Sequence, residues 1–322
     1  MKTILLHKMC AGLGEIFHSW YTLINIARVQ KQRGHRIELI IDYSHQLDRY
    51  FPSGTLDLFF DLHKLQREYF DEITISETPV TIPNPTMNWG ENWMLKTEDD
   101  KGLSEFYLLS AEALIREGKR TAEFPEIVTD FVKNYVDNII KVYNLQINQA
   151  HHVRIIDGYE REHEVSKIVD LILPNLEDND IVLSNSSIVK KAVKERSDKR
   201  LLSVDNPIEG ILSNHFTKHP SGVPKDLLFT KTLYTYLDMI LLTKGKHFHK
   251  YTVYDDNFWS SFLFHTALVQ PNFTEHQIPK DLIKGNWNNG HLADNQFLGG
   301  LDRELRGRFS LSTKSPRANL LI

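Results

Sequence analysis

The sequence predicts an α/β protein with two Rossmann-like, doubly wound domains that face each other across a cleft. Three observations support this fold class. Strand and helix patterns alternate in residues 1–42, the alternation restarts near residue 151, and a largely helical stretch separates the two regions. The length of 322 residues fits about two domains of roughly 100–200 residues each.

The first part of the chain has the pattern of a strand, a glycine turn, a helix and a second strand. Residues 2–7 form a short apolar run, and residues 15–32 have helical spacing. Gly34 lies where a helix C-cap is expected, and residues 35–42 have the composition of a strand. Such a unit predicts parallel pairing of its two strands.

The stretch that follows is harder to assign. Residues 43–100 are rich in turn-forming residues, so we expect loops and short elements there. Helices are predicted at about 103–117 and 124–144. Pro125 would occupy the first turn of the second helix, a position that tolerates proline.

Strands and helices alternate again in the second half. The predicted strands are 151–157, 180–185, 200–204 and 247–253, and the predicted helices are about 160–174, 187–196, 226–243 and 257–269. The last forty residues have weak periodicity and should form loops and one short helix. The expected domains are therefore 1–149 and 150–280, with 281–322 as a tail able to cross back to the first domain.

Composition is that of a soluble globular protein, with 41% hydrophobic and 25% charged residues. A net charge of -4 gives no overall attraction to nucleic acid or anionic membranes, although a local basic groove stays compatible with it. Cys10 is the only cysteine, which excludes an internal disulfide and a zinc site of several cysteines. We expect no membrane span, no signal peptide and a cytoplasmic location.

Glycines follow the first predicted strand. Gly12 and Gly14 allow a tight turn and the close approach of a ligand to the N-terminus of the next helix. The pattern lacks the third glycine of a dinucleotide-binding motif, so a plain turn is the alternative. His18 lies on the first turn of this helix, as a ligand contact or as a packed residue. Glu15 and Asp42 are candidate general bases, and the alternative for each is a capping or solvated carboxylate.

A second group of polar residues lies at the strand predicted for 151–157. His152 and Arg154 should share one face of this strand, with Asp157 at its carboxyl end, where doubly wound sheets bind ligands. The guanidinium group suits a diphosphate, and Glu162 on the next helix could reach the same crevice. The alternative is a buried strand with a surface ion pair.

Four segments of the chain belong together as a pattern. The segment "HHVRIIDGYERE" has the form H-x-R-x-x-D, and the others are "GLGEIFHSWYTLINIA", "DIVLSNSSIVKKAVKE" and "YTYLDMILLTKGKHFHKYTVYDDNFWSSFLFHTAL". In their order along the chain these segments resemble the GT-B fucosyltransferase superfamily, which includes α1,6-fucosyltransferases, the bacterial nodulation fucosyltransferase and protein O-fucosyltransferases. Together they cover about half of the chain, and they imply a metal-independent, inverting glycosyltransferase with a GDP-sugar donor, GDP-fucose being favoured.

The resemblance also implies roles for individual residues. Arg154 would contact the β-phosphate and stabilise the leaving diphosphate. The other residues matched to the donor or to the cleft are Gly12, Gly14, His18, His152, Asp157, Glu162, Asp238, Ser260 and Ser261. One departure concerns the base of the nucleotide, because Asn185, Ser186 and Ser187 stand where many relatives have an aspartate pair. Asn185 is a candidate donor contact at this position.

Several alternatives stay open. The acceptor could be a glycan, a lipid-linked saccharide, a protein or a modified base in DNA. A basic cluster that could contact nucleic acid phosphates consists of Lys190, Lys191, Lys194, Arg196, Lys199 and Arg200. A nucleotide-sugar-binding protein without catalysis is the non-enzyme alternative. His247 and His249 have the spacing of a metal pair on a strand, but a structural role is the favoured interpretation.

Overall fold

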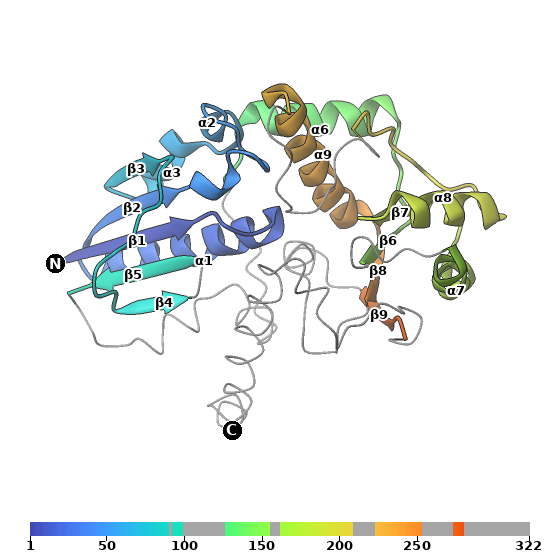
Figure 1. Ribbon diagram of the computed structural model, residues 1–322, viewed down its shortest axis with the longest axis horizontal. Helices are drawn as coiled ribbons and strands as arrows, with labels where there is room; N and C mark the ends of the chain where they lie inside the picture. The colour runs from blue at the N-terminus through green and yellow to red at the C-terminus, as the bar shows by residue number, and fades with distance from the viewer. Residues whose placement is uncertain (90–91, 99–125, 155–161, 209–222, 253–272, 280–322) are drawn as a thin grey trace, which may run out of the picture.

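The computed structural model describes residues 1–89, 92–98, 126–154, 162–208, 223–252 and 273–279. Two sheets with their own helices lie side by side, and helix α9 (Lys225–Lys244) lies between them (Figure 1). We call the part around the first sheet the first unit and the part around the second sheet the second unit. The predicted α/β class with two units is confirmed.

The first sheet has five strands in the order β3-β2-β1-β5-β4. Their bounds are Lys2–Lys8 for β1, Arg36–Asp42 for β2, Glu72–Ser76 for β3, Met87–Trp89 for β4 and Trp93–Thr97 for β5. Strand β1 pairs in parallel with β2, as predicted, and β2 pairs in parallel with β3. Strand β5 pairs antiparallel with β1, so the sheet is mixed.

Helix α1 (Leu13–Gln32) packs against β1 and β2. Its apolar residues recur at three- and four-residue spacing, and Ile16, Trp20 and Ile24 are fully buried. The helix ends at Gln32 with Arg33 as its C-cap, and Gly34 follows with a φ of +81°. Because this left-handed conformation favours glycine, the predicted C-terminal stop is confirmed.

The second sheet has four parallel strands in the order β7-β6-β8-β9. Their bounds are Gln149–Arg154 for β6, Ile181–Ser184 for β7, His247–Thr252 for β8 and Phe273–Gln277 for β9. Helices α7 (Glu162–Ile172) and α8 (Ser187–Arg196) form a core with Val153 and Tyr251. The bounds of α8 are those predicted, and the Ser186 side chain caps it by accepting from the Val189 N–H at 3.3 Å.

Shorter elements complete the two units. They are the 3-10 turns η1 (Ser44–Gln46) and η2 (Leu173–Asn175) and the helices α2 (Leu56–Phe59), α3 (Leu62–Tyr69) and α6 (Asp130–Val142). None of the helices in the described part of the chain is both long and apolar enough to cross a membrane.

Helix α9 joins the cores of the two units. Its Tyr236 ring stacks on Phe17 of α1 with centroids 5.4 Å apart. The buried cluster that contains both rings also contains Ala150 of β6 and Phe248 of β8. One apolar core therefore extends from the first sheet through α9 to the second sheet.

Two predicted elements differ from the structure. The helix predicted from residue 124 begins at Asp130, because Thr129 is its N-cap and accepts a hydrogen bond from the Val132 N–H at 3.4 Å. The strand predicted at 200–204 is reduced to a single bridge between Leu202 and Ile181. The predicted helices at 103–117 and 257–269, Pro125, and the tail at 281–322 lie outside the described residues.

Candidate functional site

The glycine turn places the N-terminus of α1 at the carboxyl end of β1. Gly12 is the N-cap and has no side chain to cap the helix. Gln46 donates hydrogen bonds to the carbonyls of Met9 and Ala11, and Arg49 donates one to the Cys10 carbonyl at 3.0 Å. The carbonyls of the turn therefore point towards the loop after β2, which leaves the first amides of α1 suited to an anion.

Glu15 and His18 meet on the first turns of α1. The Glu15 Oε2 atom lies 3.6 Å from His18 Nδ1, and the His18 imidazole is buried. Asn92 also reaches Glu15, with its Nδ2 atom 3.5 Å from the same carboxylate oxygen. A carboxylate beside an imidazole is an arrangement that can accept a proton from a hydroxyl group, although this pair is separated by more than an ordinary hydrogen bond.

Asp42 ends strand β2 and is buried. Its Oδ1 atom accepts hydrogen bonds from the Ser44 N–H and hydroxyl at 3.1 and 2.6 Å, and its Oδ2 atom accepts one from the Val80 N–H at 2.8 Å. These contacts hold the chain after β2, so the geometry favours a structural role for Asp42.

His152 and Arg154 lie on one face of β6, and the structure adds Lys250 and Glu275 to them. Lys250 is paired with His152 across β6 and β8, and its Nζ atom lies 3.0 Å from Glu275 Oε1 of β9. Burial, followed by the charges of Arg154 and Lys250, lowers the pKa of His152 to about 3. His152 is therefore neutral at pH 7, while Arg154, Lys250 and Glu275 carry the charges of this cluster.

Two further predicted site residues lie in the described part of the chain. Asn185 follows β7 and is half-buried, and Asp238 is half-buried on α9. Glu162 begins α7, but its side chain is outside the described part, as are Asp157, Ser260 and Ser261. The site contacts of Gln46 and Arg49 were not predicted. A signal for Lys250 is present in "HFHKYT", where a lysine takes an inward position of a buried strand.

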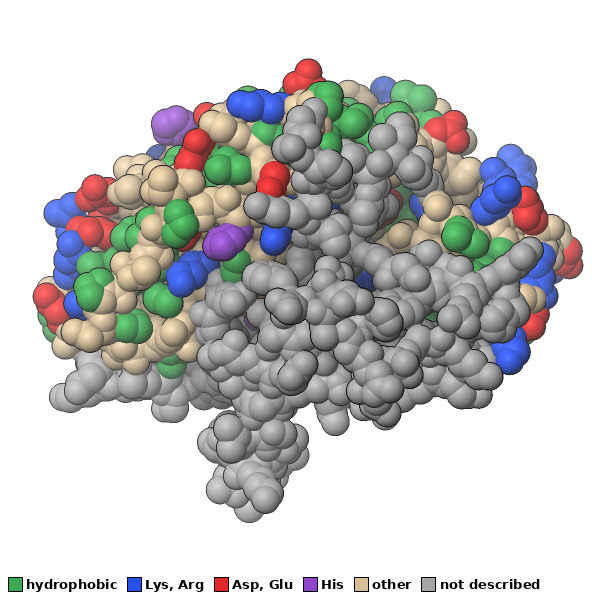
Figure 2. Space-filling model, in the orientation of Figure 1, with side chains coloured by type: hydrophobic (Ala, Val, Ile, Leu, Met, Phe, Trp, Pro, Cys, Tyr) green, Lys and Arg blue, Asp and Glu red, His purple; other side chains and the backbone are tan. Residues whose placement is uncertain are grey.

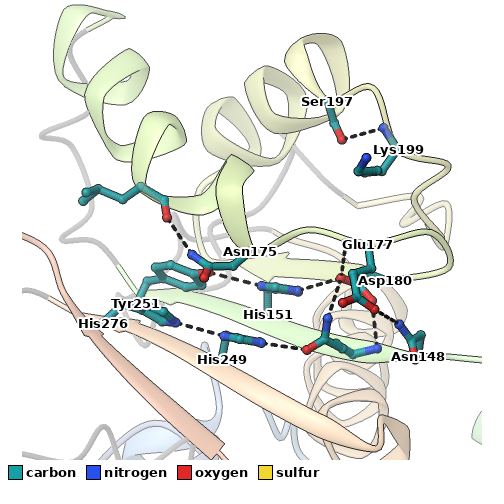
Figure 3. A network of polar contacts seen from close by, with 12 residues as sticks. Asn148, His151, Asn175, Glu177, Asp180, Ser197, Lys199, His249, Tyr251 and His276 are labelled. Carbon is teal, nitrogen blue, oxygen red and sulfur yellow. Dashed lines mark hydrogen bonds and ion pairs between the residues drawn. The ribbon is translucent and has the colours of Figure 1, made fainter.

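The other face of the second sheet carries a layer of histidines (Figure 3). His249 Nδ1 lies 2.9 Å from His276 Nε2, and His249 Nε2 lies 2.9 Å from Gln149 Oε1. His151 contacts the buried Asp180 carboxylate at 3.0 Å. Within the described ranges no group of three or more His, Cys, Asp or Glu residues is arranged to hold a metal ion. The ring nitrogens of His249 make contacts between strands.

The fold and the site define a two-unit α/β protein with polar residues at the carboxyl ends of strands β1 and β6. Solved structures of similar arrangement include NodZ alpha-1,6-fucosyltransferase co-crystallised with GDP, at 13% identity and a TM-score of 0.46, covering 87% of this chain and 97% of that one. Fucosyltransferase NodZ from Bradyrhizobium is similar at 12% identity and a TM-score of 0.47, covering 87% and 97%. No family model and no curated protein matches the chain.

Proposed function

We propose that the protein is a glycosyltransferase that moves a sugar from a sugar nucleotide to a hydroxyl acceptor with inversion at the anomeric carbon and without a metal ion. The observation that carries the proposal is the grouping of Arg154, His152 and Lys250 on one face of the second sheet, at the carboxyl half of β6 and β8. These residues lie in or beside the segment that resembles the H-x-R-x-x-D motif.

Arg154 would act on the leaving group. In an inverting transfer the acceptor oxygen bonds to the anomeric carbon while the bond from that carbon to the phosphate oxygen breaks. The electron pair of the broken bond goes to the diphosphate, so negative charge increases there in the transition state. A guanidinium group beside neutral His152 stabilises this charge, whereas the Lys250 ammonium is already paired with Glu275.

Glu15 is the favoured base for the proton of the acceptor hydroxyl. It stands at the glycine turn, its carboxylate is 30% exposed, and His18 and Asn92 lie beside it. The alternative base, Asp42, is only 2% exposed and accepts hydrogen bonds at both oxygens. In this arrangement the second unit would hold the nucleotide and the first unit the acceptor.

GDP-fucose is the favoured donor by resemblance, with another sugar nucleotide as the alternative because Asn185, Ser186 and Ser187 replace the family's aspartate pair. The surface gives little support to a nucleic acid acceptor. In the basic cluster, Arg196 pairs with Asp170, Lys191 with Glu195 and Lys199 with Asp198. Figure 2 shows acidic and basic side chains interspersed over both units on this face.

A thermal-shift panel tests the proposal. The ligands are GDP, UDP, ADP, CMP and their sugar derivatives, and Arg154→Ala protein is the matched control. A ligand at about 100 times its Kd should stabilise the folded state by about 2.7 kcal/mol. Stabilisation of the parent protein by GDP compounds, with a smaller effect in the control, supports the proposal. Stabilisation by UDP compounds alone would change the proposed donor from a GDP-sugar to a UDP-sugar. No response to any nucleotide would reject the proposed activity.

A further inference from the structure

The glycine turn is held by the segment 46–51, which we call the clamp loop. The loop is wound tightly, since the N–H groups of Arg49, Tyr50 and Phe51 all donate to the Gln46 carbonyl at 3.0 to 3.1 Å. Its side chains reach the turn through the hydrogen bonds from Gln46 and Arg49 to the carbonyls of residues 9–11. The clamp loop thus sets the direction of three consecutive peptide groups directly before α1.

Helix α9 in turn holds the clamp loop, although it lies about 180 residues later in the sequence. The Lys231 ammonium group donates to the Arg49 carbonyl at 3.4 Å and lies 4.4 Å from the centroid of the Tyr50 ring. The neighbouring Thr232 hydroxyl donates to the Tyr50 carbonyl. Contacts therefore run from α9 through Arg49 to the Cys10 carbonyl in the glycine turn.

The two cationic side chains that make these contacts are buried. Lys231 is completely buried, and Arg49 is only 7% exposed. A buried ammonium or guanidinium group is unfavourable unless its hydrogens are bonded, and an apolar side chain of similar length would pack at less cost. One buried cation bonds to a carbonyl of the clamp loop and the other to a carbonyl of the glycine turn, which indicates that they maintain the conformation of this junction.

We infer that Lys231 is a positioning residue for the glycine turn and acts through Arg49. The inference rests on the proposed function in one respect, namely that the turn faces the reacting groups. Asp238 lies seven residues after Lys231 and so on the same side of α9. One side of α9 therefore carries both Lys231, which contacts the clamp loop of the first unit, and Asp238, which the resemblance matches to nucleotide recognition.

Amide hydrogen exchange tests the inference without a substrate. The variants are Lys231→Met, Arg49→Met and the double variant, and the control is Lys244→Met at the exposed end of α9. Lys231→Met should speed exchange in residues 9–16 by about tenfold or more, with β1, β2 and the rest of α1 unchanged. If Lys231 acts through Arg49, the double variant should exchange as fast as Arg49→Met alone.

The possible results separate clearly. Unchanged exchange in residues 9–16 of Lys231→Met overturns the inference, as does full additivity in the double variant. If Lys231→Met does not fold, Thr232→Val weakens the same junction and should give the same local pattern. Under the proposed activity, Lys231→Met should lower kcat by about tenfold while the donor KM changes little, because Arg154 is on the other unit. Failure of every nucleotide to bind would reject that activity and leave the exchange result standing.

Discussion

The imidazole rings of His151 and His249 lie nearly parallel, with centroids 4.5 Å apart and 4° between their planes (Figure 3). His249 also contacts His276, so three histidines from three adjacent strands form one layer. Burial, followed by the charges of His151, His247 and His276, lowers the pKa of His249 to about 4. Protonation of His249 is therefore unfavourable within the folded layer.

This relationship predicts a loss of stability in acid. Unfolded histidine has a pKa near 6.5, so the unfolded chain binds more protons than the folded one between about pH 6.5 and pH 4. The contribution of His249 is complete above that window and is lost as the pH falls through it. We expect it to reach about 1–3 kcal/mol in the free energy of unfolding.

Urea unfolding of the parent protein and of His249→Gln over this pH range measures the effect. The variant should be less stable at neutral pH and should lose less stability on acidification. His7 and His152 also have lowered pKa values, about 4 and about 3, so part of the pH dependence should persist in the variant. Equal pH dependence in both proteins would contradict the assignment to His249.

Arg154→Ala should weaken transfer through loss of charge stabilisation in the transition state. The expected cost is at least about 2–3 kcal/mol, on the scale of removing one hydrogen-bond donor from an oxyanion site. Steady-state kinetics with the donor found by the ligand panel measures it. Arg200→Ala, an exposed arginine after α8, is the control and should retain activity. Normal turnover of Arg154→Ala would remove Arg154 from the mechanism.

Glu15→Gln should lower kcat by about 10²- to 10⁴-fold, because the amide keeps the shape of the side chain but cannot take up a proton. Stability should change little, since the Glu15 carboxylate is 30% exposed. The measurement is a pH–rate profile together with an unfolding curve. Turnover within about twofold of the parent protein at every pH would exclude Glu15 as the base.

Asp42→Asn should act on stability and leave the chemistry unchanged. The amide nitrogen of asparagine cannot accept the hydrogen bonds that one carboxylate oxygen takes from Ser44 or Val80. The expected cost is about 1–3 kcal/mol in the free energy of unfolding. Urea unfolding, with turnover measured per folded molecule, checks this. A stable but inactive variant would restore Asp42 as a candidate base.

The sequence predicted correctly the ends of helices that are fixed by a capping residue or a glycine next to the helix. The bounds of α8 follow from the Ser186 cap, and the end of α1 follows from Gly34. The sequence did not reveal β9, because "FTEHQ" has only one apolar residue and obtains its place from pairing with β8. Strand β5 is likewise defined by antiparallel pairing with β1, a long-range contact that a local pattern does not encode.

The candidate site residues that lie near the carboxyl ends of strands could be predicted from the sequence. Strand periodicity correctly placed His152 and Arg154 on one face. The contributions of Arg49 and Lys231 depend on the packing of α9, so spacing along the chain gave no indication of them. For Lys250 the sequence contains a signal, a lysine within a buried strand, but its partners depend on strand register. Asp42 and His249 differ in that the polar atoms of these chemically suitable side chains make hydrogen bonds within the fold.

Because the apolar core continues through α9, the two halves of the chain should not fold as separate fragments. A cut near residue 150 would follow the order of the sequence but would leave Phe17 and Phe59 without the Tyr236 ring that packs on both. The first fragment would expose these rings to water, and α9 in the second fragment would expose its matching side. The two halves should therefore melt in a single transition when joined, and should recover a native structure only as a complemented pair when expressed separately.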